Sequence, residues 1–184
     1  MAHEFFDALR DVVLAVNSSL EPKNVLKKVV AQVAETMHCK ASTIRLLDRT
    51  ERFLLPSAAY GLSDSYMRKG PVEVKKSGMD SEVLAGKVIH LRDAAADGRF
   101  QYPASAKQEG LVSVLSAPLM SDGKAIGLIR VYSAEERDFS EDEHHFMEAV
   151  AAISAIAIQN ARLHEELRNN YDLMAKHTYQ VFED

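Results

Sequence analysis

The spacing of hydrophobic residues changes twice along the chain, and each change predicts a different kind of element. Apolar residues recur every three or four positions in residues 5–16, in residues 22–37 and again from Phe139 onward. Residues with that spacing share one side of a helix, so three amphipathic helices are expected, each packing one face on the rest of the protein. Ser140 and Glu143 begin the last of them and predict a capping box.

The middle of the chain predicts strands instead. Its most strongly patterned stretch is residues 110–133, where two β-branched apolar runs flank an Asp122-Gly123 pair. Such a pair predicts a hairpin because glycine tolerates positive φ. Neither run alternates with polar residues, so both faces of the hairpin are expected to be covered. Shorter strand-like runs lie at residues 41–47, 53–60, 72–75 and 88–91.

The segments between the strands hold the candidate binding chemistry. Residues 77–86 predict a short helix with Ser77 as its N-cap, and residues 63–68 predict one helical turn. Residues 92–110 are polar, contain aromatic residues and are longer than an ordinary connection. Loops of that length are usually functional or disordered, and the aromatic content favours a functional loop.

A cleft between the 77–86 helix and the 92–110 loop is the site that these residues predict. Backbone N–H groups at the helix start and the Arg99 side chain are suited to an anion, and Phe100 or Tyr102 to stacking on a ring. The alternative is that the two aromatic side chains only pin the loop to the core.

Composition and charge exclude several functions. The chain has 184 residues with 22 lysines and arginines against 27 acids, a net charge of −5, and no basic cluster. A nucleic-acid partner is therefore not expected. No segment has the roughly 18 consecutive apolar residues of a membrane span, and the acidic start does not resemble a signal peptide, so we expect a cytoplasmic protein without a membrane partner.

Catalytic and metal signatures are also missing from the sequence. It has no nucleophile elbow, no glycine-rich phosphate loop and no HExxH pair, so no enzyme activity and no catalytic residue are predicted. The spacing of His90, Asp93 and Asp97 is not diagnostic of a metal site, and a solvated loop is favoured there. The single cysteine, Cys39, excludes an internal disulfide and a multi-cysteine zinc site, and is expected to be a small core residue.

Four motifs in order resemble the GAF domain family. They are GLVSVLSAPL followed by DGKAIGLIRVYS, then R-x-F-S-E-D-E at residues 137–143, then AIAIQNARLHEEL at residues 155–167, with DAAADGRFQYPASAKQEG upstream as the variable loop on the ligand side. The resemblance implies an N-terminal helix over residues 1–19, a GAF domain over 20–167 and a C-terminal helical extension over 168–184.

The fold that this resemblance implies is of the α+β class, GAF/PAS-like. A six-stranded antiparallel sheet would carry the terminal helices on one face, while short helices and loops on the other face form a small-molecule pocket. The residues that correspond to the pocket wall are Leu46, Tyr60, Met67, Met79, Val83, Leu91, Phe100, Tyr102 and Ser116.

The function that the resemblance implies is a non-catalytic, stand-alone bacterial sensor. It would bind a small molecule and pass the signal along terminal helices that form a homodimer, to a signalling partner such as the histidine kinase of a two-component system. The alternative is a ligand-free dimerisation module that presents its helices to that partner. Asn160 lies on an otherwise apolar helix face, where it either fixes dimer register or bonds within the monomer.

Departures from the family motifs disfavour its commonest ligands. No Asn-Lys pair precedes the segment around Phe139, where the two acids also come one residue early, which disfavours cyclic nucleotides. Cys39 is poorly placed to attach a bilin, and a lone cysteine does not fit the methionine-sulfoxide-reducing members. No cofactor or ligand is therefore assigned from the sequence.

Overall fold

An antiparallel sheet of six strands forms the middle layer of the protein. The computed structural model describes residues 2–17 and 21–180, with side chains described for 3–17 and 21–172. The sheet order is β3-β2-β1-β6-β5-β4, and every neighbouring pair is antiparallel. The strands are β1 (Ala41–Leu47), β2 (Phe53–Tyr60), β3 (Val72–Glu73), β4 (Ile89–Leu91), β5 (Ser113–Ser121) and β6 (Lys124–Ser133).

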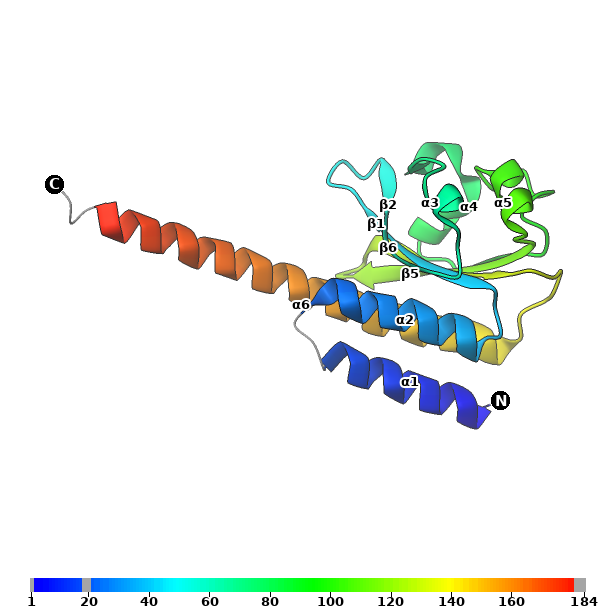
Figure 1. Ribbon diagram of the computed structural model, residues 1–184, viewed down its shortest axis with the longest axis horizontal. Helices are drawn as coiled ribbons and strands as arrows, with labels where there is room; N and C mark the ends of the chain where they lie inside the picture. Colours follow the sequence, from blue (N-terminus) through cyan, green and yellow to red (C-terminus); the bar gives the residue numbers. More distant parts are fainter. Residues whose placement is uncertain (1, 18–20, 181–184) are drawn as a thin grey trace.

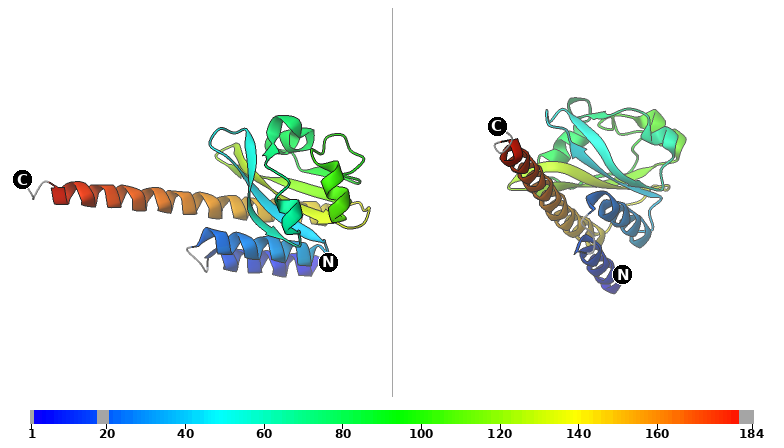
Figure 2. Two further views of the ribbon diagram at one scale, coloured as in Figure 1. Left: turned by 45° about the horizontal axis from the view of Figure 1, so that its top comes forward. Right: turned by 60° about the vertical axis from the view of Figure 1, so that its left-hand side comes forward.

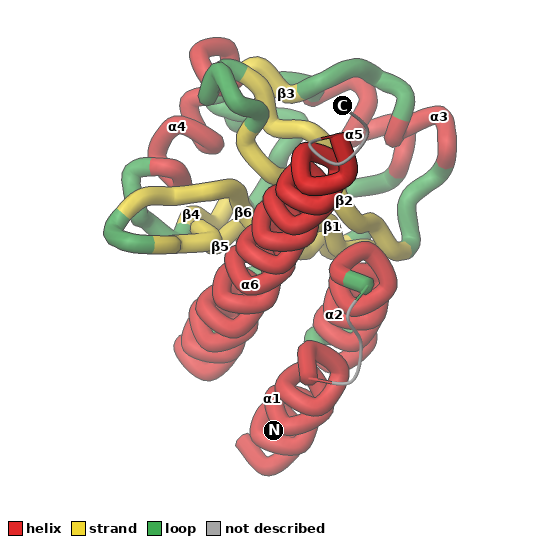
Figure 3. Tube along the Cα trace, turned by 90° about the vertical axis from the view of Figure 1, so that its left-hand side faces the viewer, coloured by secondary structure: helices red, strands yellow, loops and turns green. Residues whose placement is uncertain are grey.

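Three long helices cover one face of this sheet. They are α1 (Ala2–Asn17), α2 (Pro22–Thr36) and α6 (Glu141–Gln180). Helices α2 and α6 lie on the strands and α1 packs outside them (Figure 1, Figure 3). Their apolar stripes meet the sheet in one buried cluster that includes Val30, Leu115 and Val150. The C-terminal half of α6 extends beyond the sheet, away from the other elements (Figure 2).

Short elements cover the opposite face. They are α3 (Asp64–Met67), the 3₁₀ turn η1 (Val74–Lys76), α4 (Gly78–Leu84) and α5 (Pro103–Glu109) (Figure 1). Two smaller buried clusters join them to the sheet, one around Met79 and Val114 and the other around Val83 and Leu128. The α+β architecture expected from the sequence is therefore confirmed.

The central hairpin forms as its Asp-Gly pair predicts. Asp122 and Gly123 both have positive φ, 50° and 76°, as a type I′ turn requires, and Ser121 pairs with Lys124 across it. Side chains of β5 alternate between the two layers, with Leu115 toward the long helices and Val114 toward the short elements. Both faces are thus covered, as the lack of polar alternation indicated.

Two details of the segments between strands differ from the sequence predictions. Residues 92–110 are not an irregular loop throughout, because they contain α5, which Gly110 ends in a left-handed conformation at φ 69°. Only Ala106 of α5 is buried, so the sequence shows no apolar stripe there. The strand expected over 72–75 stops at Glu73, and η1 begins at Val74. Residues 1, 18–19 and 181–184 of the predicted terminal segments lie outside the described residues.

The start of α6 has the predicted capping box. The Glu143 N–H donates to Ser140 Oγ at 3.3 Å, and the Ser140 N–H donates to Glu143 Oε2 at 2.8 Å. Arg137 anchors this end by donating to the carbonyl of Met37 at 3.1 Å and by pairing with Glu143. The start of α6 is therefore attached to the end of α2.

Candidate functional site

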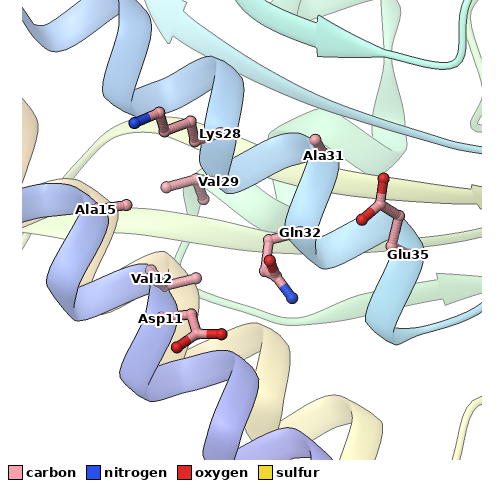
Figure 4. A pocket seen from close by; sticks show the side chains of 8 residues that line it. All are labelled: Asp11, Val12, Ala15, Lys28, Val29, Ala31, Gln32 and Glu35. Atoms are coloured by element: carbon pink, nitrogen blue, oxygen red, sulfur yellow. The ribbon is translucent and has the colours of Figure 1, made fainter.

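The protein has a groove between helices α1 and α2 with a volume of about 320 Å³. In Figure 4, α1 lines it with Asp11, Val12 and Ala15, while α2 contributes Lys28, Val29, Ala31, Gln32 and Glu35. Two of its polar side chains are engaged within the protein, since Gln32 donates to Thr36 and Glu35 accepts from Tyr60. The groove therefore offers an apolar floor and mixed charges, without a convergent set of donors.

A second hollow lies between the sheet and the short elements, and its chemistry is more specific. We call it the sheet-side pocket. Its volume is about 10 Å³, room for about one water molecule. Charged and aromatic side chains dominate the lining, which consists of Arg45, Tyr66, Lys69, Val72, Asp80, Phe100, Gln101, Tyr102, Arg130 and Tyr132.

One buried ion pair stands in this pocket. Arg130 of β6 donates through Nη2 to Asp80 of α4, and each side chain is 3% exposed. Burial opposes the charge of Arg130, but Asp80 and the nearby tyrosines outweigh it and raise the pKa of Arg130. The rings of Phe100 and Tyr132 lie 5.6 and 5.9 Å from its guanidinium carbon, within cation–π range. Arg130 thus has both a charge partner and aromatic neighbours.

Arg45 of β1 lacks such a partner. It is 1% exposed, and its Nη1 donates to the carbonyl of Leu54 across a long 3.4 Å. Among the described residues, none accepts a hydrogen bond from its Nε or Nη2. Buried donors without acceptors are rare and costly in proteins. In the β1–β2 ladder, Ile44 opposes Ala58 and Arg45 opposes Pro56, so the extra residue of the bulge beside this position, Ser57, lies in β2.

Lys69 closes the pocket from the end of α3. Its Nζ lies 3.3 Å from the centroid of the Tyr66 ring and 5.6 Å from that of Tyr102. Burial, followed by repulsion from Arg45 and Arg130, lowers the pKa of Lys69 to about 7, against the weaker opposing effects of Glu109 and Asp80. The pocket is therefore positively charged, because two guanidinium groups and an amine that titrates near neutral pH face the carboxylate of Asp80.

Tyr66 carries another buried polar group. Burial raises the pKa of the Tyr66 hydroxyl above its ordinary value, so the group stays protonated. In the described part of the chain, its oxygen meets no hydrogen-bond partner. It therefore adds a neutral donor and acceptor to the charged lining.

The roof of the pocket is held by contacts with the edge strand. Phe100 is buried, and the Tyr102 hydroxyl donates to the carbonyl of Pro71 at 2.8 Å. Gln101 accepts from the N–H of Glu73 at 3.0 Å. The segment between β4 and α5 is thus fastened over the sheet by these hydrogen bonds and the buried Phe100, and also by Arg99, whose carbonyl accepts from the Met79 N–H and whose guanidinium pairs with Glu82.

The residues predicted for the pocket wall lie in several different places. Phe100 and Tyr102 line the cavity. Met79 and Leu91 are buried beside Phe100 in one apolar cluster, and Val83 in the neighbouring one. Met67 is half-buried at the end of α3, next to Lys69.

The remaining predicted residues lie outside the cavity. Leu46 packs on the cluster beneath the long helices, Tyr60 donates to Glu35 of α2 at 3.0 Å, and Ser116 donates to the carbonyl of Ile129 at 3.2 Å. Leu46 faces the long helices because it shares the orientation of Ile44, whereas Arg45 between them points into the pocket.

Arg99 lies at the surface rather than over the cavity. It pairs with Asp97 at 2.8 Å and with Glu82 at 3.0 Å. The backbone N–H groups predicted to bind an anion beside it are partly used within the protein. The N–H of Met79 donates to the carbonyl of Arg99, and that of Asp80 to Ser77 Oγ. The cleft built on Arg99 is therefore occupied by the protein's own groups.

The charged residues of the pocket were missed by the sequence analysis, although two of them left a signal. Arg45 and Arg130 each interrupt an apolar strand, and β6 was expected to be covered on both faces. A charge in such a strand must be buried, and buried charges occur at functional sites more often than elsewhere. Asp80 and Lys69 left no comparable signal, because both lie in short polar segments.

The fold and the pocket define a class of protein: an α+β domain whose sheet separates a layer of long helices from a small polar pocket under short helices. A comparison with known protein families agrees with this description. A family model described as GAF domain matches residues 19–159. The chain belongs to the GAF domain family, as the sequence motifs indicated.

Solved structures agree with this assignment. The GAF domain of a phosphoenolpyruvate-protein phosphotransferase from Acinetobacter is 27% identical, with a TM-score of 0.73 over 86% of this chain and 94% of that one. The corresponding domain from Coxiella burnetii is 21% identical, with a TM-score of 0.81 over 90% and 98% of the two chains. A domain of a putative two-component sensor histidine kinase from Sinorhizobium meliloti 1021 is 21% identical, with a TM-score of 0.64 over 78% and 94%. Domains of this fold thus occur in signalling proteins.

Within residues 2–17 and 21–180, no helix combines the length and apolarity needed to cross a membrane. No three histidine, cysteine, aspartate or glutamate side chains of the described part of the chain come together as metal ligands. The candidate functional site is the sheet-side pocket, because its lining brings Arg45, Lys69, Asp80 and Arg130 together with aromatic side chains.

Proposed function

We propose that this GAF domain is a non-catalytic sensor that binds a small molecule in the sheet-side pocket and passes the signal through its long helices. One observation carries the proposal: Arg45 is buried on the pocket face of the sheet with two donors that no described residue satisfies. A protein that uses this arginine only for structure would gain by pairing it or replacing it with an apolar residue. A ligand that accepts these hydrogen bonds gives the arginine a role.

Binding requires the pocket to open. A volume of about 10 Å³ does not hold an organic molecule, so a ligand must displace the roof formed by Phe100 and Tyr102. The domain then has a closed and an open state, and a ligand that binds only the open state shifts the population toward it. This change requires the two hydrogen bonds that Gln101 and Tyr102 make with residues 73 and 71 to break.

The sheet connects the pocket to the helices. Arg45 and Arg130 lie on the neighbouring strands β1 and β6, which are paired along their length. Ile44 and Ile129, which oppose each other in that pairing, point to the other face and pack in the cluster under α2 and α6. A shift of the two arginines toward a ligand therefore changes the surface on which the helices rest.

The exposed part of α6 is the proposed output. Ile156, Leu163, Leu167 and Tyr171 each expose more than half of their surface and follow one side of the helix. We call these four residues the α6 stripe. Asn160 is exposed and lies on the same side, one turn after Ile156. A homodimer that pairs two α6 stripes buries them, with Asn160 setting the register, and offers a helical surface to a bacterial signalling partner such as a histidine kinase.

The second candidate function is a dimerisation module that binds no ligand. The α6 stripe supports it independently of the pocket, and so does the small volume of the closed cavity. In this role, the pocket charges serve only to position the short elements on the sheet.

Native mass spectrometry of freshly purified protein tests these proposals, first under gentle and then under denaturing conditions. A dimer with an added small mass that denaturation releases supports the sensor and identifies its ligand. A dimer without added mass, which also binds nothing in a metabolite screen, supports the ligand-free module. A monomer at all concentrations contradicts the helix-pairing part of both.

A further inference from the structure

We propose that the ligand of the sheet-side pocket is a small organic carboxylate, held by the edge of Arg45 that carries Nε and Nη2. This inference rests on the proposed sensor function and names the chemical class that the pocket selects. It depends on which atoms of Arg45 lack acceptors, on the charge of the pocket and on the groups beside the arginine.

The two unpartnered atoms of Arg45 form one donor edge. Nε–H and one Nη2–H lie in the guanidinium plane and point in nearly the same direction. A carboxylate accepts both in two parallel hydrogen bonds. Nη1, on the other side, donates to the Leu54 carbonyl and orients the group. The edge is thus buried and complementary to a carboxylate.

The charges of the pocket match one negative group. Asp80 neutralises Arg130 in their ion pair, which leaves the charge of Arg45 without a counterpart. The groups facing Lys69 are Arg45, Arg130, Glu109 and Asp80, together with the rings of Tyr66 and Tyr102. Lys69 therefore adds a second positive charge only when it is protonated.

A carboxylate fits this setting better than a phosphate. A phosphate dianion presents three acceptor oxygens, whereas Arg45 offers one donor edge and the Asp80 carboxylate lies in the same pocket. The aromatic side chains of Phe100, Tyr102 and Tyr132 complete the lining and suit the carbon skeleton of a small organic acid.

The test observes the arginine side chains directly by NMR, in the full chain labelled with ¹⁵N-arginine. Sodium acetate, acetamide and sodium phosphate are added separately, with sodium chloride keeping the ionic strength constant. Acetate is expected to move the Arg45 Nε–H resonance saturably, while acetamide, its neutral counterpart, leaves it in place and phosphate acts more weakly. Exposed Arg52 serves as the internal control, because its resonance reports only general salt effects.

Variants link the effect to the donor edge. Arg45→Lys keeps the charge but loses the paired donors, so acetate affinity, followed through backbone amides of β1, should fall about tenfold or more. Arg45→Met removes the charge as well and should abolish binding, which keeps the test valid if the lysine variant does not fold. Arg52→Lys, the matched control, should bind acetate as the wild type does.

Several results would overturn the inference. They are an equal response to acetamide, a stronger response to phosphate than to acetate, a response of Arg45 no larger than that of Arg52, or unchanged acetate binding by Arg45→Met. If native mass spectrometry finds a ligand without a carboxylate, the sensor proposal stands and the carboxylate inference fails. If it finds no ligand and acetate does not bind, both fail.

Discussion

Replacing Arg45 by methionine is expected to stabilise the ligand-free protein, which is unusual for a residue that is 1% exposed. The change removes a buried charge and two donors without acceptors, and it costs one long hydrogen bond to Leu54. Each unsatisfied buried group costs about 1–3 kcal/mol, and a typical hydrogen bond contributes about 0.5–1.5 kcal/mol. Methionine keeps most of the aliphatic packing of the arginine stem.

The expected net effect is a rise of about 1–4 kcal/mol in the free energy of unfolding, the range seen when buried ionic groups become apolar. Each kcal/mol corresponds to a change of about 2–4 °C in Tm for a chain of this length. Urea unfolding followed by circular dichroism, with a thermal melt of the same samples, measures both quantities. The protein must first be freed of any co-purified ligand, since a bound ligand stabilises the wild type.

Arg130→Met is the matched comparison, because it alters the other buried arginine of the same sheet face. Removal of Arg130 leaves the buried carboxylate of Asp80 without its partner. That change should lower the free energy of unfolding by about 3–5 kcal/mol. If Arg45→Met destabilises the protein as strongly as Arg130→Met does, Arg45 has a structural partner and the reasoning is refuted.

Three further predictions address other parts of the structure. Lys69→Met should stabilise the protein most at or below about pH 7. The lowered pKa of Lys69 costs its full amount of stability there, and the cost disappears as the pH rises toward the pKa of this lysine in the unfolded chain. Urea unfolding at low and high pH measures the difference, and a difference that does not change with pH would contradict the prediction. Gly127→Ala should lower the free energy of unfolding by about 1–3 kcal/mol or more, because the added Cβ would lie 2.2 Å from the Arg45 carbonyl oxygen. The control Gly98→Ala, whose Cβ would meet nothing within 4 Å, should leave stability nearly unchanged. Leu163→Asp should raise the dimer dissociation constant, measured by analytical ultracentrifugation, by roughly tenfold or more, because it removes a leucine from the α6 stripe. Asn169→Asp, on the opposite side of α6, should leave the constant unchanged. Equal effects of the two variants would contradict pairing through the α6 stripe.

The central hairpin and the start of α6 were predictable because local residues determine them. The turn at Asp122-Gly123 depends on the φ angles of two residues, and the capping box on Ser140 and Glu143. Helix α5 was not predictable from periodicity, because only Ala106 of its seven residues is buried. Its proline start and glycine end were the available signals.

The pocket was harder to predict than the fold because alternation along a strand does not say which face is which. The alternation along β1 shows that Ile44 and Leu46 lie on one face of the strand and Arg45 on the other. Both faces of β1 are covered, so an apolar side chain is compatible with either face, and alternation alone does not identify the pocket face. The family resemblance implied that Leu46 belongs to the pocket wall, whereas Arg45 lines the pocket. The pairing of Arg130 with Asp80 joins residues 50 positions apart and depends on tertiary structure.

On the proposed sensor function, the cost of burying Arg45 provides a route that couples ligand binding to the helices. In the closed domain, the two unsatisfied donors of Arg45 lower the stability of the fold. A carboxylate that accepts both hydrogen bonds removes this cost. The backbones of β1 and β6 are tightly packed at Arg45, because Gly127 of β6 has no Cβ to contact the Arg45 carbonyl oxygen. A ligand that draws the guanidinium toward it therefore acts on two paired strands, whose opposite faces carry Ile44 and Ile129 under α2 and α6. On the proposed sensor function, a favourable contact in the pocket changes the packing of the long helices in this way.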